Sequence, residues 1–128
     1  MPTRTEMTDD DIAQVERALH DKIQLNLDTR IMLRSRRLED DCGEEEENEI
    51  GVKLQDLTVA ADILEKQLMA FESGTASIQP PTDQQINAIE SLSASVDSLN
   101  RAQAVGSGAL GMAQVVLTVA QPLVAPGG

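Results

Sequence analysis

The stretch that decides the fold is residues 50–71, IGVKLQDLTVAADILEKQLMAF. Seven of its apolar residues recur at alternating spacings of four and three: Ile50, Leu54, Leu57, Ala61, Leu64, Leu68 and Phe71. This is the heptad pattern of a coiled-coil seam, and it fits a helix and no strand. An apolar stripe of that length cannot remain in water, so the segment must lie along another helix.

The composition of the whole chain also favours helices. Its 128 residues suit one domain (1–128) with a modest hydrophobic core. One Phe is the only aromatic residue, so the core must be built from Leu, Ile, Val, Ala and five Met. These residues suit helix-on-helix packing and are poor material for a β-sandwich. The composition therefore predicts an all-α protein, a small helical bundle.

Acidic residues dominate the first part of the chain. The formal net charge is −12; residues 1–73 contain nine Lys and Arg against nineteen Asp and Glu, whereas residues 74–128 contain one against three. Phosphate binding needs clustered cations, and so does adsorption to an anionic membrane surface. The charge thus argues against nucleic-acid partners and leaves basic protein partners open.

Cysteine usage and the start of the chain bear on localisation. Cys42 is the only cysteine, which excludes an internal disulfide and any CxxC metal or redox site. The first residues, MPTRTEMTDDD, lack the apolar region of a secretory signal. We therefore expect a reducing, cytoplasmic setting.

A first helix is expected upstream of the heptad stretch, at about residues 8–41. Thr8 is the predicted N-cap, and three aspartates follow it where carboxylates meet the positive end of the helix dipole. Gly43 is expected to end the helix in the left-handed conformation. Between Thr8 and Gly43, apolar residues recur at helical spacing at Ile12, Val15, Leu19, Ile23, Leu27, Ile31 and Leu38.

The second helix is predicted over residues 44–72, with four glutamates in its first turn. Two helices of about thirty residues joined by a short turn favour an antiparallel, coiled-coil-like hairpin over residues 8–72. With the turn near residue 44, the expected facing pairs are Leu38 with Ile50, Ile31 with Leu57, Leu27 with Ala61 and Leu19 with Leu68. Arg34 then lies opposite Leu54, half-buried, with its stem along the seam or its guanidinium paired with Glu49 or Asp56.

The second half of the chain begins with a linker at residues 73–82, where Ser73-Gly74 ends the helix and Pro80-Pro81 enforces an extended backbone. Thr82 and Gln85 form the pattern of a capping box, with Pro81 and Ile86 placed for a hydrophobic staple. The apolar positions that follow predict a third helix at about residues 83–104.

The last part of residues 83–128 is an uncharged segment. No charged residue follows Arg101, and Gly106-Ser107-Gly108 marks a turn before the apolar stretch 109–121. That stretch predicts a short fourth helix packed on the bundle, and thirteen residues are too few to span a bilayer. Two alternatives remain open: a flexible or partner-covered tail, and membrane insertion of residues 104–125 as one helix.

Signs of chemistry are missing from the sequence. His20 has no second histidine or usable cysteine to complete a zinc site. The acidic run 40–44 lacks the alternating oxygen ligands of an EF-hand loop, and carboxylates near Cys42 make it a poor nucleophile. The glycines of 106–111 have no preceding strand and no following Lys, so they do not form a phosphate-binding loop. We expect no enzyme activity, catalytic residue, metal or cofactor, and no small-molecule substrate is evident.

The sequence is therefore interpreted as a non-enzymatic interaction or assembly protein, an adaptor, chaperone or accessory subunit that binds a protein partner or a second copy of itself. Val52, Val59, Ile63 and Met69 lie off the main seam and need cover of their own. The candidate interaction residues are Leu54, Leu57, Leu64, Leu68, Phe71, Arg34, Val115 and Val119. The alternative is a membrane-active or secreted helical protein whose uncharged C-terminal segment inserts into a membrane.

Overall fold

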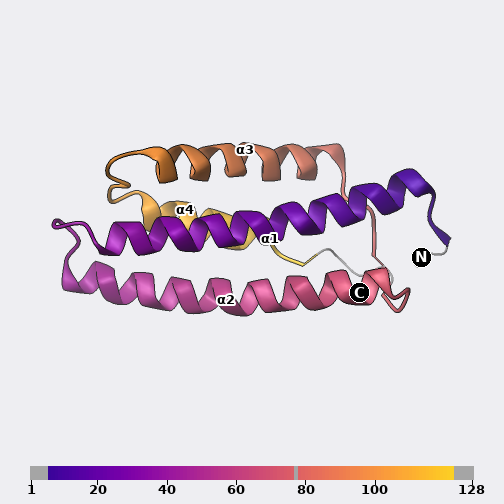
Figure 1. Ribbon diagram of the computed structural model, residues 1–128, viewed down its shortest axis with the longest axis horizontal. Coiled ribbons are helices and arrows are strands. Elements are labelled where there is room, and N and C mark those ends of the chain that lie inside the picture. The colour runs from indigo at the N-terminus through magenta and orange to yellow at the C-terminus, as the bar shows by residue number, and fades with distance from the viewer. Residues whose placement is uncertain (1–5, 77, 123–128) are drawn as a thin grey trace.

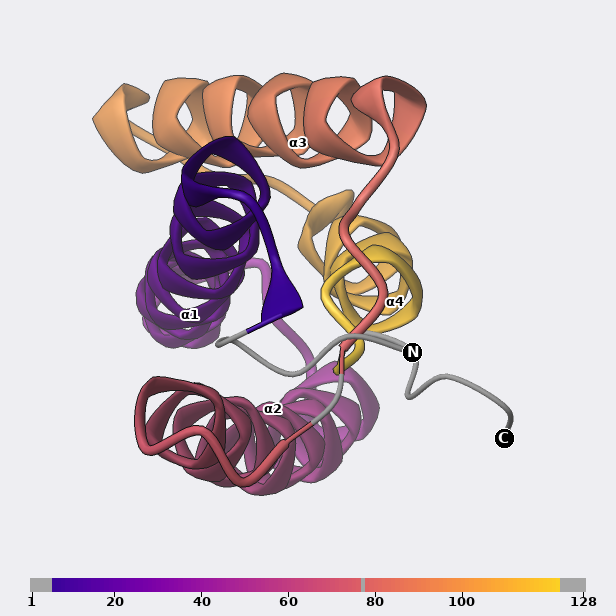
Figure 2. The same cartoon turned by 90° about the vertical axis from the view of Figure 1, so that its right-hand side faces the viewer.

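Four α-helices make up the fold in a computed structural model, which describes residues 6–76 and 78–122. The helices are α1 (Asp9–Arg37), α2 (Glu44–Glu72), α3 (Asp83–Arg101) and α4 (Ala109–Val119). Each runs antiparallel to the next, and α1 lies between α2 and α3 (Figure 1). Seen along α1, helix α3 crosses above α1 and α4, and α2 lies on the opposite side (Figure 2). This confirms the all-α bundle and the antiparallel hairpin.

Most helix ends lie where the sequence predicts them. The Thr8 hydroxyl accepts a hydrogen bond from the Asp11 N–H at 3.1 Å, which caps α1. The capping box at α3 is complete: the Gln85 N–H donates to the Thr82 hydroxyl at 3.2 Å, and the Thr82 N–H donates to the Gln85 side chain at 2.9 Å. Helix α2 has the predicted bounds, and Gly74 ends it with a φ of 80°. Helix α3 ends at Arg101, short of the expected residue 104.

The connection between α1 and α2 differs from the prediction. Helix α1 ends at Arg37 rather than near residue 41, because Asp40 and Asp41 are poor helix formers and oppose the negative end of the helix dipole. The chain then makes tight turns in which the Glu39 N–H donates to the Arg36 carbonyl at 3.0 Å. Gly43 has a φ of −78° and is the N-cap of α2, so its predicted left-handed C′ role was wrong.

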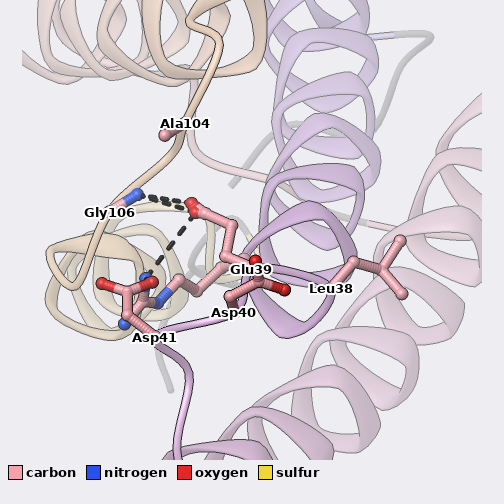
Figure 3. A pocket seen from close by; sticks show the side chains of 7 residues that line it. Leu38, Glu39, Asp40, Asp41, Ala104 and Gly106 are labelled. Atoms are coloured by element: carbon pink, nitrogen blue, oxygen red, sulfur yellow. Dashed lines mark hydrogen bonds and ion pairs between the residues drawn. The ribbon is translucent and has the colours of Figure 1, made fainter.

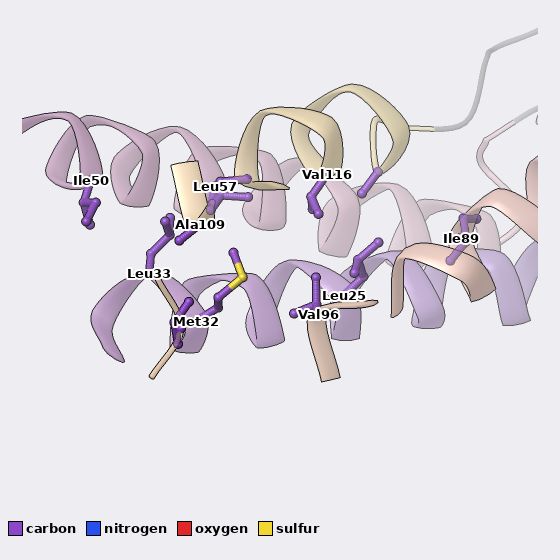
Figure 4. Close-up of a cluster of buried hydrophobic side chains, with 12 residues drawn as sticks. Leu25, Met32, Leu33, Ile50, Leu57, Ile89, Val96, Ala109 and Val116 are labelled. Carbon is purple, nitrogen blue, oxygen red and sulfur yellow. The ribbon is translucent and has the colours of Figure 1, made fainter. Parts of the chain in front are cut away.

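The main hydrophobic core lies where all four helices meet. Figure 4 shows side chains from α1, α2, α3 and α4 gathered in this space. Short side chains of α4 let it approach the other helices closely. The buried members of this main cluster are Leu25, Met32, Leu33, Ile50, Leu57, Ile89, Val96, Val105, Ala109, Ala113, Val116 and Ala120.

A second core cluster fills the other end of the hairpin. Helices α1 and α2 have 29 residues each, about 43 Å, whereas α4 has 11 residues, about 16 Å, and cannot cover their full length. Ile78 of the linker, 1% exposed, and Met7 cover the remainder instead. The buried members of this end cluster are Met7, Val15, Ala18, Leu19, Leu64, Phe71 and Ile78.

The sequence predicted the inner face of α1 correctly only in its first half, where Val15 and Leu19 are buried. Leu27, Ile31 and Leu38 are 39%, 43% and 85% exposed. The Asn26 side-chain amide donates to the Leu57 carbonyl at 2.8 Å, so Asn26, not Ile31, lies against Leu57. The earlier end of α1 shifts the register of the hairpin, and the facing pairs expected for Leu27, Ile31 and Leu38 were wrong.

The C-terminal segment follows its first interpretation, a short helix packed on the bundle. Helix α4 buries Ala109, Ala113 and Val116, and the preceding turn uses Gly106 with a φ of 83°. None of the helices in the described residues is long and apolar enough to cross a membrane. The part of the predicted tail at residues 123–128 lies outside the described residues.

Candidate interaction surface

Most of the predicted interaction residues help to hold the chain's own core together. Leu57, Leu64 and Phe71 are fully buried. Leu54 and Leu68 are partly buried against the two core clusters, Leu54 against the main cluster with Val119 and Leu68 against the end cluster. Their contacts are intramolecular, so a partner reaches the three buried side chains only when the bundle opens.

The two remaining candidates lie on the surface. Val115 is 46% exposed, and Arg34 is exposed as well. Arg34 forms no salt bridge within residues 6–76 and 78–122, so the predicted half-buried position and the pairing with Glu49 or Asp56 were wrong. The structure buries the arginine two residues later, Arg36, in its place.

An uncovered apolar stripe runs along the outer face of α2. Val52, Val59 and Ile63 are 59%, 55% and 46% exposed. Their spacings of seven and four residues place them on one side of the helix. The buried residues of α2 lie on the opposite side, toward the core. We call these three residues the α2 stripe, and the structure supplies no cover for them within the described residues.

Carboxylates border the α2 stripe. Glu49 lies one turn before Val52, and Asp56 lies between Val52 and Val59; both are exposed. Neither forms an ion pair in the part of the chain that the structure describes. Two lysines of α2 lie near these carboxylates: Lys66 is bound by Asp62 at 2.9 Å, and the half-buried Lys53 donates to the side chain of Gln114. The α2 stripe is therefore a row of three exposed apolar side chains, with one carboxylate before Val52 and another between Val52 and Val59.

One buried arginine fixes the end of the hairpin at which α1 connects to α2. Arg36 is 2% exposed and donates to both carboxylate oxygens of Glu46, at 2.6 Å and 2.8 Å. It also donates to Asp41 at 2.7 Å and lies 3.6 Å from Glu39. The hydrogen bonds from Arg36 hold the pKa of Glu46 below its usual value, and Glu46 in turn raises the pKa of Arg36. This Arg36 cluster locks the start of α2 onto the end of α1.

The Arg36 cluster also holds the loop between α3 and α4. Glu39 accepts hydrogen bonds from the Gly106 N–H at 2.9 Å and 3.3 Å, as Figure 3 shows. A hollow of about 460 Å³ lies between these loops, lined by Arg36, Glu39, Asp40 and Gly106 among others. Three carboxylates neutralise the charge of the Arg36 guanidinium and occupy its N–H groups. The arrangement therefore stabilises the two loops.

The structure gives the surroundings of the two residues that the sequence raised for metal binding and nucleophilic chemistry. His20 is exposed on α1. Burial, followed by the charge of Glu46, raises the pKa of the Cys42 thiol, which agrees with the expected poor nucleophile. In the described ranges no group of three or more His, Cys, Asp and Glu side chains is arranged to hold a metal ion.

A partial signal for this surface was present in the sequence. The exposure of Val52, Val59 and Ile63 follows from their positions off the heptad seam. The burial of Arg36 could not be found in this way, because it depends on where α1 ends. Comparison of the chain with protein-family models, with curated proteins and with solved structures finds no match.

Proposed function

We propose that the protein is a non-enzymatic interaction or assembly protein that binds an amphipathic helix of a partner along the α2 stripe. The observation that carries this proposal is the exposure of Val52, Val59 and Ile63 on a helix whose opposite face already fills the core. Aligned apolar residues on a rigid helix are a ready docking site for a second helix. The single cysteine supports a cytoplasmic setting for this interaction.

The spacing of the stripe favours a helical partner. Residues separated by seven and four positions repeat at the period of a coiled-coil seam, so apolar side chains at the same spacing on a partner helix pack between them. The partner helix then covers three side chains that the chain itself leaves in water. Burial of these side chains supplies the affinity.

The charge of the stripe selects the kind of partner. Glu49 and Asp56 border the apolar residues without an ion pair within residues 6–76 and 78–122. Lysine or arginine residues at the flanking positions of a partner helix complement these carboxylates and speed the encounter. A second copy of this chain carries the same carboxylates and the same net charge of −12, which opposes self-association through this face.

The direct test uses a synthetic helix as the probe. A fluorescent peptide with leucines at heptad positions and lysines at the flanking positions is titrated with the full chain, and anisotropy reports binding. We expect saturable binding that weakens as salt is added, because screening reduces the attraction between lysines and carboxylates. A peptide with glutamates in place of the lysines should bind much more weakly.

A matched pair of variants locates the binding face. Val59→Glu places a charge in the centre of the stripe, and Thr58→Glu adds the same charge at an exposed position off the stripe. We expect about tenfold or greater weakening for Val59→Glu and little change for Thr58→Glu. Equal affinity of the two variants would rule out the α2 stripe as the docking face. If the chain instead forms concentration-dependent dimers that Val59→Glu abolishes, the partner at this face is a second copy of the chain.

A further inference from the structure

A second feature of the molecule, away from the α2 stripe, is a cavity of about 400 Å³. It lies between α1, the N-terminal turn of α3 and the C-terminal half of α4. Its wall is apolar at Ile89 and Val119 and carries hydroxyl and amide groups at Thr82, Gln85 and Thr118. A concave site with an apolar wall and a few polar groups is the usual form of a small-ligand pocket.

Lys22 of α1 brings a charge to this cavity. It is 6% exposed, and among the described residues it is the one charged side chain of the cavity wall. Its ammonium group donates to the Gln121 carbonyl at 2.6 Å, which uses one of its three N–H bonds. No carboxylate of residues 6–76 or 78–122 lies within 4 Å of this ammonium group.

A buried ammonium group without a counter-ion is unfavourable. Burial lowers the pKa of Lys22 from its ordinary 10.5 to about 8, and no neighbouring charge opposes this change. At pH 7 the group still carries its proton, so the cavity presents a positive charge in a protein whose net charge is −12. An apolar residue at this position would avoid the cost of burying a charge. An anion in the cavity would supply the missing charge.

We infer that this cavity binds a small organic monocarboxylate, with its carboxylate on the Lys22 ammonium group and a short aliphatic chain against Ile89 and Val119. One cation neutralises one negative charge, which fits a carboxylate better than a phosphate dianion. The positive end of the α3 dipole, at the Thr82 cap, lies at the same wall and favours the same charge. The apolar wall favours a chain of a few carbons over acetate.

The test is an NMR titration of the full chain with sodium butyrate. The side-chain carbon and nitrogen signals of lysine report the environment of each ammonium group. We expect the Lys22 signals to shift in a saturable way and the pKa of Lys22 to rise in the complex, because the carboxylate favours its protonated form. Acetate should bind more weakly than butyrate, and inorganic phosphate more weakly still.

Two variants make the result specific. Lys22→Met keeps the length of the side chain and removes the charge, and we expect at least about tenfold weaker butyrate binding. Lys66→Met removes an exposed lysine that pairs with Asp62 on α2, and we expect no change. No saturable shift at Lys22, or equal affinity of the wild type and Lys22→Met, would overturn the assignment. Tighter binding of phosphate than of butyrate would overturn the choice of a monocarboxylate.

Discussion

Four polar side chains of α1 lie in the interior of the bundle, and they differ in how fully their hydrogen-bonding groups are satisfied. Thr29 donates to the Leu25 carbonyl of its own helix, and Asn26 donates to the Leu57 carbonyl of α2. Arg36 has three carboxylates, whereas Lys22 has one carbonyl. The Asn26 side-chain oxygen accepts no hydrogen bond within the described part of the chain. Asn26 and Arg36 therefore link α1 to α2, whereas the unpaired Asn26 oxygen and the buried Lys22 charge lower the stability of the fold.

The first prediction concerns the stability cost of Lys22. Its pKa is lower in the folded protein than its ordinary 10.5, so the unfolded chain binds more protons between pH 8 and 10.5 and stability rises with pH in that window. Lowering a pKa from 10.5 to about 8 corresponds to about 3 kcal/mol. Lys22→Met should recover part of this at pH 7, about 2 kcal/mol after loss of the hydrogen bond to Gln121.

Urea denaturation of the wild type and Lys22→Met at pH 7 and pH 10.5 measures this difference. The advantage of the variant should shrink at the higher pH, where the wild-type amine is neutral. Lys66→Met serves as the control on an exposed lysine. A variant less stable than the wild type at pH 7 would show that the Lys22 ammonium group stabilises the fold.

The second prediction concerns Glu46 and acid. Arg36 lowers the pKa of Glu46 below its usual 4.5, so the ionised pair contributes stability above pH 4.5 that is lost as the pH falls through the lower folded pKa. Glu46→Gln should melt earlier than the wild type at pH 7, and the difference in melting temperature should shrink as the pH falls below 4.5. Thermal melts of both proteins across this range, with the exposed Glu45→Gln as control, test the assignment. A constant difference from pH 7 to pH 3 would mean that shape, not charge, explains the effect of Glu46→Gln.

At the scale of helices, the sequence predicted α2 more accurately than α1. The heptad residues of α2 point into the core, so periodicity identified the inner face, while the glutamates after Gly43 and the Ser73-Gly74 pair marked the bounds. On α1 the inner face carries Lys22, Asn26, Thr29 and Arg36, while Leu27, Ile31 and Leu38 lie on the exposed side. A pattern of hydrophobicity alone cannot recover a face that contains four polar residues. Arg34 was predicted on the seam in place of Arg36 because α1 ends earlier than expected.

The third prediction compares two leucines that share the apolar pattern of the hairpin. Leu64 of α2 is fully buried, and Leu38 at the end of α1 is 85% exposed. Leu64→Ala should cost about 2–4 kcal/mol of unfolding free energy, because it removes buried atoms and leaves a cavity. Leu38→Ala should change the stability by less than about 0.5 kcal/mol. Chemical denaturation measures both, and a small effect of Leu64→Ala would mean that the end of the hairpin is open in solution.

At the scale of the whole molecule, the core consists of two clusters because α4 is too short to cover the full length of the hairpin. The main cluster depends on α4 for cover, whereas the end cluster lies under Ile78 and Met7. The sequence predicted a packed fourth helix, but it gave no sign that Ile78 of the linker would be 1% exposed. The glycine and prolines of the linker predict where the helices end. They do not predict which part of the core the linker covers.

The fourth prediction follows from this division of the core. Deleting residues 105–128 removes five buried residues of the main cluster, Val105, Ala109, Ala113, Val116 and Ala120, and should expose Leu25 and Leu57. At about 25 cal/mol for each Å² of apolar surface, the loss should reach several kcal/mol, and the truncated chain should melt earlier and bind a hydrophobic dye. An unchanged melting temperature would show that α4 does not cover the core.

Hydrogen exchange on the truncated chain tests the division itself. Amide protection reports the free energy of local opening, and helical segments that lose their packing open more readily. The first half of α2, around Ile50 and Leu57, should lose protection when α4 is absent. The second half, around Leu64 and Phe71, should keep more of its protection, because Ile78 and Met7 still cover it. Equal loss along the whole of α2 would mean that the two clusters unfold as one cooperative unit and that α4 stabilises residues it does not contact.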